Sequence, residues 1–492
     1  MKLPLLSMIT FAPVLGILVI SLIPRGKDML IRRVATIFSA LPFVFIVYVF
    51  TQFDFGAKKM QFIERIPWIK QVGIFYYMGI DGISIALLFV TGLLSIMAML
   101  ASWEIKERVK EYFTLMLFLE TGMLGVFVAL DYILFYIFWE ITLVPMYFLI
   151  GIWGGPRREY AAIKFFIYTL LGSVLMLLAI LALYFQADIK SFSITQLWNA
   201  GRTFALAVQI PIFLGFYAGF AVKIPVFPFH TWLPDAHVEA PTAVSVLLAG
   251  VLLKLGGYGF FRIAMPSFPA AFERFVPWLV VLALINIIYG AYVAMAQRDL
   301  KKLVAYSSIS HMGYILLGLV ALNEAGLDGS MFQMVSHGLT TGMLFLLVGI
   351  IYSRTHTRLI SELGGMQGKV PMLAGALAFD SMASLGLPGL SGFIGEFLVL
   401  VGVIMAAHLH PVFAVLAALN IVLTAGYLLW MIQRVSLGKI GEKLKSITDL
   451  SGFELAYLIP LIVLILLFGL YPTLLLNIFD VSVKNILTIM GG

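Results

Sequence analysis

The chain of 492 residues contains no cysteine. This absence excludes disulfide bonds, iron–sulfur clusters and thiolate-ligated haem within the chain. Histidine is scarce as well, and only His311 and His337 lie inside long apolar runs, which is too few to ligate haem in a helix bundle. Neither a Gly-x-Gly-x-x-Gly motif after a strand nor a phosphate-binding loop occurs, so we find no nucleotide site. We therefore expect that this chain itself binds no cofactor and no metal.

Charged residues are also few. They make up 12% of the chain, whereas hydrophobic residues make up 62%, and the mean hydropathy is +1.04. This composition is typical of proteins that cross a membrane many times. The net charge of +7 does not indicate nucleic-acid binding, because the lysines and arginines are spread over short loops. No hydrophilic stretch is long enough to bury a core of its own. We expect an all-α integral membrane protein without a soluble domain.

Fourteen apolar runs are long enough to cross a hydrocarbon core of about 30 Å as helices. Only Asp131 separates the fourth run from the fifth. We expect no cleavable signal peptide, because the first run is long enough to remain in the membrane as a span. The predicted spans are 4–24, 32–52, 76–101, 112–130, 132–153, 160–185, 208–228, 242–264, 275–297, 303–321, 328–352, 372–402, 410–433 and 453–478.

The loops differ in their positive charge. Most lysines and arginines between the runs fall in loops that follow odd-numbered runs, and such loops are cytoplasmic by the positive-inside rule. Residues 53–73, with four basic side chains, run against this bias. The rule predicts that both termini lie outside the cytoplasm.

Three ionisable side chains interrupt the apolar runs. They are Glu140 in YILFYIFWEITLVPMYFLIGIW, Lys223 in FLGFYAGFAVKIPVFPF and Lys254 in TAVSVLLAGVLLKLGGYGFF. A charge near the bilayer centre costs about 2.5–3.5 kcal/mol, so each group must face a partner or water. One carboxylate cannot neutralise two lysines, which leaves one lysine able to take up and release protons. Glu140 and Lys223 could instead form a purely structural buried pair.

Other polar groups within the runs are weaker candidates. His311 and His337 fit a proton relay, although a membrane histidine can also serve only as a hydrogen-bond partner between helices. Lys164 lies near a run end and could extend to the membrane surface. Asp81, close to the start of a run, is expected to be structural. The remaining candidates are Glu120, Asp380 and Glu396.

Two predicted helices are interrupted in a similar way. In run 208–228, Lys223 directly precedes two prolines, and in run 372–402 the sequence GLPGLSG precedes Glu396. Such breaks free backbone groups that neighbours or water must satisfy, and a matched pair of breaks indicates internal repeats around a functional centre. Runs four to eight and nine to thirteen then form two inverted five-helix units. The predicted organisation is one polytopic domain, with three spans in 1–111, a first repeat in 112–264, a second in 275–434 and the last span in 435–492.

Residues 227–258, FPFHTWLPDAHVEAPTAVSVLLAGVLLKLGGY, resemble the signature of the antiporter-like subunits of respiratory complex I. This family also includes Mrp-type cation/proton antiporters and membrane-bound hydrogenases. The stretch FYIFWEITLVPMYFLIGIWG resembles the family's fifth helix, with Glu140 as its glutamate. Glu396 stands where most members carry a lysine and the M type carries a glutamate. The chain also lacks the long lateral helix of the L type, so both features favour the M type.

The resemblance implies a proton-translocating subunit of the membrane arm of an NADH:quinone oxidoreductase in a bacterial inner membrane. NADH, FMN, iron–sulfur clusters and quinone would be bound by partner subunits, with L-type and N-type antiporter-like subunits and lipids as neighbours. An opening Glu140–Lys223 ion pair would change the proton affinity of a neighbouring lysine. The residues implied in proton translocation are Glu140, Lys223, Lys254, His311, His337 and Glu396, with Glu120, Lys164 and Asp380 as accessory groups.

Three alternatives stay open at this point. The chain could belong to an Mrp-type antiporter, although a lysine would then be expected in place of Glu396. It could belong to a membrane-bound hydrogenase or formate-oxidising complex. A purely structural scaffold is the third alternative, and the series of buried ionisable groups disfavours it. The sequence leaves open whether the ion is a proton or sodium, the stoichiometry, the direction of each half-channel and the quinone type.

Overall fold

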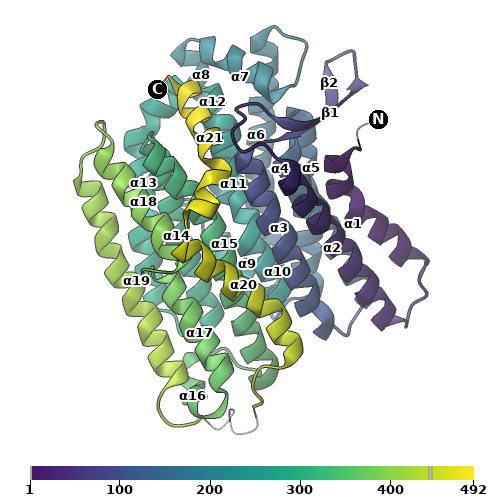
Figure 1. Cartoon of the computed structure of the whole chain (residues 1–492), viewed down its shortest axis with the longest axis vertical. Coiled ribbons are helices and arrows are strands. Elements are labelled where there is room, and N and C mark those ends of the chain that lie inside the picture. The colour runs from purple at the N-terminus through teal and green to yellow at the C-terminus, as the bar shows by residue number, and fades with distance from the viewer. Residues whose placement is uncertain (1–2, 442–443, 445–446, 492) are drawn as a thin grey trace.

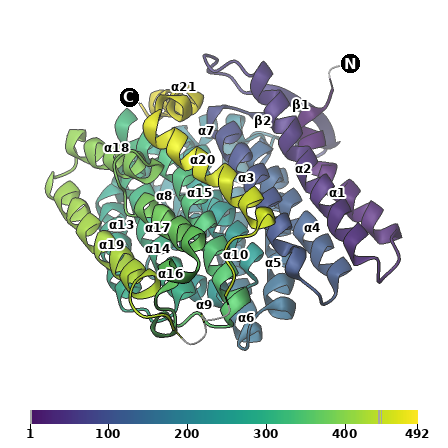
Figure 2. The ribbon, with the colours of Figure 1, turned by 60° about the horizontal axis from the view of Figure 1, so that its bottom comes forward.

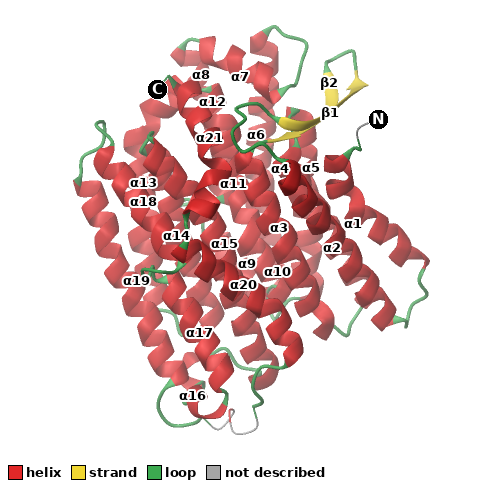
Figure 3. Cartoon of the chain, in the orientation of Figure 1, coloured by secondary structure: helices red, strands yellow, loops and turns green. Residues whose placement is uncertain are grey.

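The structure is a computed structural model that describes residues 3–441, 444 and 447–491. The chain folds into a bundle of helices with a two-stranded hairpin at one end (Figures 1 and 3). Fourteen helices among the described residues are long and apolar enough to cross a membrane, which confirms the expected all-α membrane fold. Both chain ends lie at the same end of the bundle (Figures 1 and 2).

The helices and strands fall into three groups. The long continuous helices are α1 (Leu5–Leu22), α2 (Asp28–Gln52), α3 (Gly82–Ala101), α4 (Val109–Val128), α5 (Tyr132–Trp153), α6 (Arg158–Ala187), α8 (Leu206–Lys223), α13 (Pro269–Met295), α14 (Leu300–Val320), α15 (Glu324–Thr355), α19 (Val412–Ser436), α20 (Gly452–Leu470) and α21 (Thr473–Met490). One further span is composite, made of α10 (Thr242–Leu247), η2 (Leu248–Leu252), α11 (Leu253–Gly259), η3 (Phe260–Ala264) and α12 (Met265–Ser267). The shorter elements are β1 (Gln61–Ile69), β2 (Ile74–Ile80), η1 (Ser102–Glu104), α7 (Ile194–Thr203), α9 (Trp232–Glu239), η4 (Ile360–Glu362), α16 (Met366–Lys369), α17 (Pro371–Ser384) and α18 (Ser391–Met405).

Burial separates a central set of helices from a peripheral set. The composite span, α14 and α15 are almost entirely buried, whereas α1, α2 and α19 expose most of their length. The exposed side chains on these outer helices are apolar, as with Leu18, Ile37 and Val422. In a membrane protein, lipid or a neighbouring subunit covers such a face. The polar groups described below therefore lie in the middle of the bundle, away from lipid.

The first predicted break is present, directly after Lys223, where α8 ends and the chain continues as α9. Asn286 of α13 satisfies the freed backbone groups. Its Oδ1 accepts a hydrogen bond from the Phe227 amide at 2.8 Å, and its Nδ2 donates to the Pro225 carbonyl at 3.0 Å. Because unsatisfied backbone groups are costly inside a membrane, this side chain holds the break in place.

The second predicted break is also present and separates α17 from α18. Gly386 and Gly389 have φ angles of +83° and +93°, a region that favours glycine. The glycines of the GLPGLSG segment therefore let the chain turn sharply within the bundle. This turn brings α18, with Glu396, against α15 and α14.

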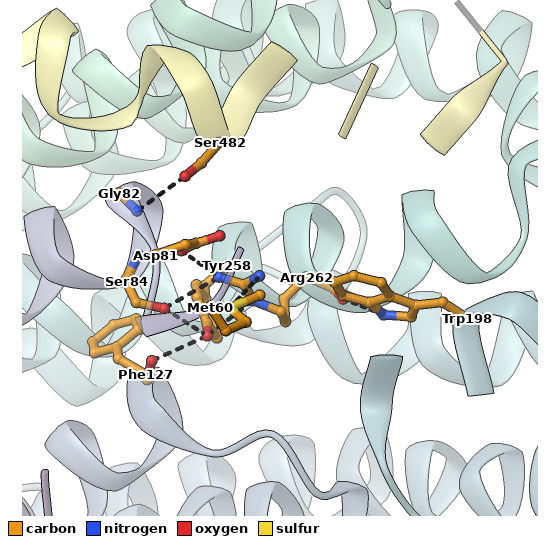
Figure 4. Close-up of polar contacts among 9 residues, drawn as sticks. All are labelled: Met60, Asp81, Gly82, Ser84, Phe127, Trp198, Tyr258, Arg262 and Ser482. Carbon is orange, nitrogen blue, oxygen red and sulfur yellow. Dashed lines mark hydrogen bonds and ion pairs between the residues drawn. The ribbon is translucent and has the colours of Figure 1, made fainter. Parts of the chain in front are cut away.

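The predicted start of the third span, at residue 76, is wrong. Residues 76–80 belong to strand β2, which pairs antiparallel with β1, and α3 begins only at Gly82. The Asp81 side chain accepts a hydrogen bond from the Ser84 amide, which caps α3 and sets its first residue. The residues after the last predicted span also form a helix, α21, which packs on α3 and α15. Ser482 of α21 accepts a hydrogen bond from the Gly82 amide at 2.9 Å (Figure 4).

Asp81 is part of a buried polar cluster at the end of the bundle that carries the hairpin (Figure 4). Arg262 of η3 pairs with Asp81 at 2.5 Å and donates to the hydroxyl of Tyr258 at 3.1 Å. Tyr258 in turn donates to the Phe127 carbonyl of α4 at 3.1 Å. The cluster fixes the composite span to α3 and α4, in agreement with a structural role for Asp81.

Candidate functional site

Lys254 lies at the centre of the candidate site, fully buried on α11 between two π-helical segments. Its Nζ is 2.6 Å from Nδ1 of His337 on α15 and donates to the Ala249 carbonyl at 2.5 Å. Gly338 lets α15 approach the composite span closely, because a Cβ atom at this position would lie 3.1 Å from the carbonyl oxygen of Gly250. π-helical segments within α-helices are frequently found at functional sites.

A line of polar groups continues from His337. The ring centroids of His337 and His311 are 5.6 Å apart, and His311 Nδ1 is 3.1 Å from Oε1 of Glu396. The other ring nitrogen of His311 is 3.2 Å from the hydroxyl of Ser384, at the end of α17. Nε2 of His337 is buried and has no hydrogen-bond partner among the described residues. The structure thus brings four of the predicted groups, from four helices, into one buried line with a gap between the histidines.

The broken helix makes room for the carboxylate at the end of this line. A Cβ atom at Gly386 would lie 3.2 Å from Oε2 of Glu396, which is tighter than an ordinary contact. The turn between α17 and α18 therefore both exposes backbone and admits the Glu396 side chain. The glycines that mark the break in the sequence also shape the space for the acid.

Glu140 and Lys223 do not form a direct ion pair within 4 Å. Lys223 is buried, and its Nζ has no hydrogen-bond partner among the described residues. It lies 5.4 Å from the ring centre of Trp139, in a cation–π arrangement, and within electrostatic range of Glu140. Oε1 of Glu140 is also buried without a hydrogen-bond partner. The two charges are neighbours across α5 and α8 rather than a closed pair.

His237 of α9 is a group that the sequence reasoning missed. It is fully buried, and neither ring nitrogen has a hydrogen-bond partner among the described residues. Lys254 and His337 both lie within its electrostatic range. His237 falls between two apolar runs in the sequence, so hydropathy placed it in a loop. The fold-back of the chain at Lys223 carries it into the core, and the only signal was its place within the family-like stretch.

The three accessory candidates have different surroundings. Lys164 pairs with Asp235 of α9 at 2.8 Å, so it does not extend alone to the surface. Glu120 on α4 and Asp380 on α17 are fully buried, and their carboxyl oxygens have no hydrogen-bond partners among the described residues. Neither carboxyl is connected to the line from Lys254 to Glu396 by a hydrogen bond within the described part of the chain.

One group of carboxylates among the described residues is close enough to hold a cation: Glu324, Asp328 and Asp480. Lys484 already pairs with Glu324 at 3.1 Å and with Asp480 at 2.8 Å. The cluster therefore has a cation of its own and does not argue for a metal site.

Fold and site together define a polytopic membrane protein with buried ionisable side chains beside two broken helices. Residues 129–424 match the family model described as NADH:quinone oxidoreductase/Mrp antiporter, transmembrane. The chain belongs to this family of antiporter-like membrane subunits. It is 45% identical to NADH-quinone oxidoreductase subunit M of Rhodobacter capsulatus, with 98% of this chain and 96% of that protein covered. It is 42% identical to subunit M of Rickettsia bellii, with 99% of each covered.

Solved structures agree with this assignment. A chain of respiratory complex I from Thermus thermophilus superposes with a TM-score of 0.90 at 31% identity, covering 99% of this chain and 100% of that one. A chain of the Mrp complex from a Dietzia species superposes with a TM-score of 0.84 at 22% identity, covering 97% and 52%. The second likeness shows the shared fold alone.

Proposed function

We propose that this chain is the M-type proton-translocating subunit of the membrane arm of a bacterial NADH:quinone oxidoreductase. The observation that carries the proposal is the buried line from Lys254 through His337 and His311 to Glu396. The full-length similarity to subunit M chains favours complex I over an Mrp antiporter. Electron transfer would take place in partner subunits that hold FMN, iron–sulfur clusters, NADH and quinone, with L-type and N-type subunits as membrane neighbours.

Each group in the line has a role that its chemistry permits. Lys254, as an ammonium, gives a proton to Nδ1 of His337, and a neutral imidazole that accepts at one nitrogen can release from the other. The proton then crosses the gap to His311, by water or by ring rotation. His311 passes it to Glu396. Every step moves one proton between a donor and an acceptor and needs no redox group in this chain.

Glu140 and Lys223 would control the line electrostatically. With Lys223 close to Glu140, its charge is compensated, and with the two apart, the positive charge acts on the next lysine. In this scheme, the separation of the two groups would be that of the open arrangement. Lys164, Glu120 and Asp380 are accessory groups in this scheme.

The repeat organisation and the orientation belong to the same proposal. Residues 112–264 and 275–434 would be two inverted five-helix repeats, and the matched breaks in α8/α9 and α17/α18 support this assignment. The loops rich in lysine and arginine would face the cytoplasm, with both termini outside.

Lys254→Met tests the proposal, because methionine keeps the length of the side chain and removes the titrating group. We expect proton pumping by the reconstituted complex, normalised to assembled protein, to fall by roughly a hundredfold. Lys302→Met, at a half-buried lysine outside the line, is the control and should pump normally. Normal pumping by assembled Lys254→Met complex would rule the relay out.

A further inference from the structure

The ammonium of Lys223 is surrounded by aromatic ring faces where hydrogen-bond acceptors would be expected. Its side chain is 2% exposed, and its Nζ has no hydrogen-bond partner among the described residues. Nζ lies 5.4 Å from the ring centre of Trp139 on α5 and 5.9 Å from that of Phe165 on α6, and both rings are buried. Aromatic rings attract a cation at such distances, tryptophan most strongly, and more so where water is excluded. We call Trp139 and Phe165 the aromatic clamp.

Further aromatic side chains fix the clamp in place. Trp139 packs on Phe220 of α8 with ring centroids 5.8 Å apart, and Phe165 packs on Trp232 of α9 at 5.4 Å. The indole N–H of Trp232 donates to the carbonyl of Val222 at 3.1 Å, one residue before the end of α8. The clamp is therefore tied to the helix break at which the lysine stands.

The clamp and the carboxylate are alternative partners for the same ammonium. Trp139 and Glu140 are consecutive residues of α5, and consecutive side chains of an α-helix point about 100° apart around its axis. A carboxylate compensates the charge of Lys223. An aromatic ring has no net charge, so it stabilises the ammonium and leaves the positive field acting on its surroundings.

We propose that Trp139 and Phe165 are positioning residues, which hold the Lys223 ammonium apart from Glu140 in the open arrangement. The inference rests on the proposed function, because it needs the charge of Lys223 to act on Lys254. The ammonium moves between carboxylate and indole, and no covalent bond forms or breaks in this step. A weaker clamp shifts Lys223 towards Glu140, compensates its charge and slows the relay.

A packing role for the two rings makes a different prediction. Packing depends on the size and shape of a buried ring and not on its charge distribution. Fluorine atoms on the indole withdraw electron density from the ring face, which weakens the attraction for a cation, while the shape of the ring changes little. Fluorinated tryptophans at position 139 therefore separate the cation–π contact from packing.

The first test places tryptophans with an increasing number of fluorine atoms at position 139 and measures proton pumping and NADH:quinone turnover of the whole reconstituted complex. We expect normal assembly and a stepwise fall in pumping, to roughly a tenfold loss with the most fluorinated ring. The same series at Trp198 is the control, because this indole is buried and its neighbour Arg262 lies over Tyr258 (Figure 4). A flat series at position 139, or an equal fall at Trp198, overturns the inference.

A second test uses the same substitution at two buried phenylalanines. Phe165 and Phe216 are both 0% exposed, and of the two only Phe165 has Lys223 over its ring. We expect Phe165→Leu to lose pumping severalfold, normalised to assembled protein, and Phe216→Leu to pump close to the parent rate. Equal pumping by the two variants speaks for packing and overturns the inference.

The structure of the assembled complex with Trp139→Leu gives a readout that does not depend on activity. Without the indole face, we expect Nζ of Lys223 to lie within about 4 Å of the Glu140 carboxylate, as in an ion pair. A lysine that stays apart from Glu140 overturns the inference. The proposed function fails separately: normal pumping by Lys254→Met removes the relay, whereas a flat fluorine series beside an inactive Lys254→Met complex removes the clamp alone.

Discussion

The two broken helices differ in how the charged group beside each break is held. Lys223, beside the α8/α9 break, has no hydrogen-bond partner among the described residues and rests against Trp139. Glu396, beside the α17/α18 break, contacts His311 at 3.1 Å, and the line continues to Lys254. We call the part around the α8/α9 break the unbonded half, because Lys223 interacts with Glu140 only through electrostatics. The part around the α17/α18 break is the bonded half, because the polar line there has one gap, between the two histidines. In the proposed relay a break of this kind is needed, because a proton path connected from face to face would leak.

The largest effects are expected in the unbonded half, where a charge without its counterpart is most costly. Glu140→Gln or Lys223→Ala should each abolish most proton pumping and lower coupled redox turnover. Because the two groups act through one another, the double variant should be little worse than either single variant. Pumping assays on assembled complex give all three values. A normal pumping stoichiometry in Glu140→Gln would contradict this prediction. A double variant whose loss of pumping equals the product of the two single losses would contradict it as well.

Glu396 tests the bonded half. Glu396→Gln keeps the size and hydrogen-bonding capacity but cannot hold a transferable proton, so it should assemble normally and pump poorly. Glu396→Lys should retain part of the activity, because lysine also titrates, although its charge now opposes His311. The measurement is pumping normalised to assembled protein. If the glutamine variant pumps as well as the parent, Glu396 is structural and the line ends at His311.

The sequence predicted the fold class and both helix breaks, because hydropathy and the positions of proline and glycine depend on local chemistry alone. It also singled out Lys254 and Glu396, since a charge inside an apolar run is conspicuous. It missed His237, which stands between apolar runs. The burial of His237 depends on how α9 folds back into the bundle, a tertiary effect that no local pattern carries.

The pairing of charged groups could not be predicted from the sequence either. A carboxylate in the fifth predicted span and a lysine in the seventh suggested an ion pair between Glu140 and Lys223. In the structure these two groups lie apart, whereas Lys164 forms an ion pair with Asp235. Which charges meet depends on helix rotation and on the course of α9, and neither follows from spacing along the chain. The start of α3 was misplaced for a related reason, because an apolar strand of a hairpin resembles the end of a span.

A smaller effect should follow from crowding the bonded half without removing a charge. Gly386→Ala places a Cβ atom 3.2 Å from Oε2 of Glu396 and forces a residue with a side chain to adopt a φ of +83°. The strain is about 1 kcal/mol or more, so we expect a severalfold loss of pumping with an assembled complex. Gly375→Ala on α17 is the control, because nothing lies within 4 Å of its added Cβ atom. Equal pumping by the two variants would show that the space around Glu396 is not tightly shaped.

The smallest effect concerns Asp131, which fixes the hairpin end of α5, the helix that carries Glu140. Its Oδ1 accepts from the Ile133 amide at 2.9 Å and its Oδ2 from the Phe75 amide at 3.1 Å, so it ties α5 to the hairpin. Burial raises the pKa of the Asp131 carboxyl to about 6, with the hydrogen bonds opposing. The folded state therefore holds this proton more tightly than the unfolded state does. The resulting stabilisation is complete below the unfolded pKa, near 3.8, and is lost as the pH rises through about 6.

Asp131→Asn removes that titration, and its amide oxygen can still cap α5. Between about pH 4 and 7, the thermal unfolding temperature of the parent complex should fall more steeply than that of the variant. The corresponding difference in the free energy of unfolding is at most about 3 kcal/mol. The exposed Asp54→Asn, in the loop before the hairpin, controls for general charge effects. Parallel pH dependences of the parent and Asp131→Asn would show that the carboxyl is ionised throughout. The hairpin would then be tied to α5 by hydrogen bonds to a permanent anion, and protonation of Asp131 would contribute nothing to the stability of the helix that carries Glu140.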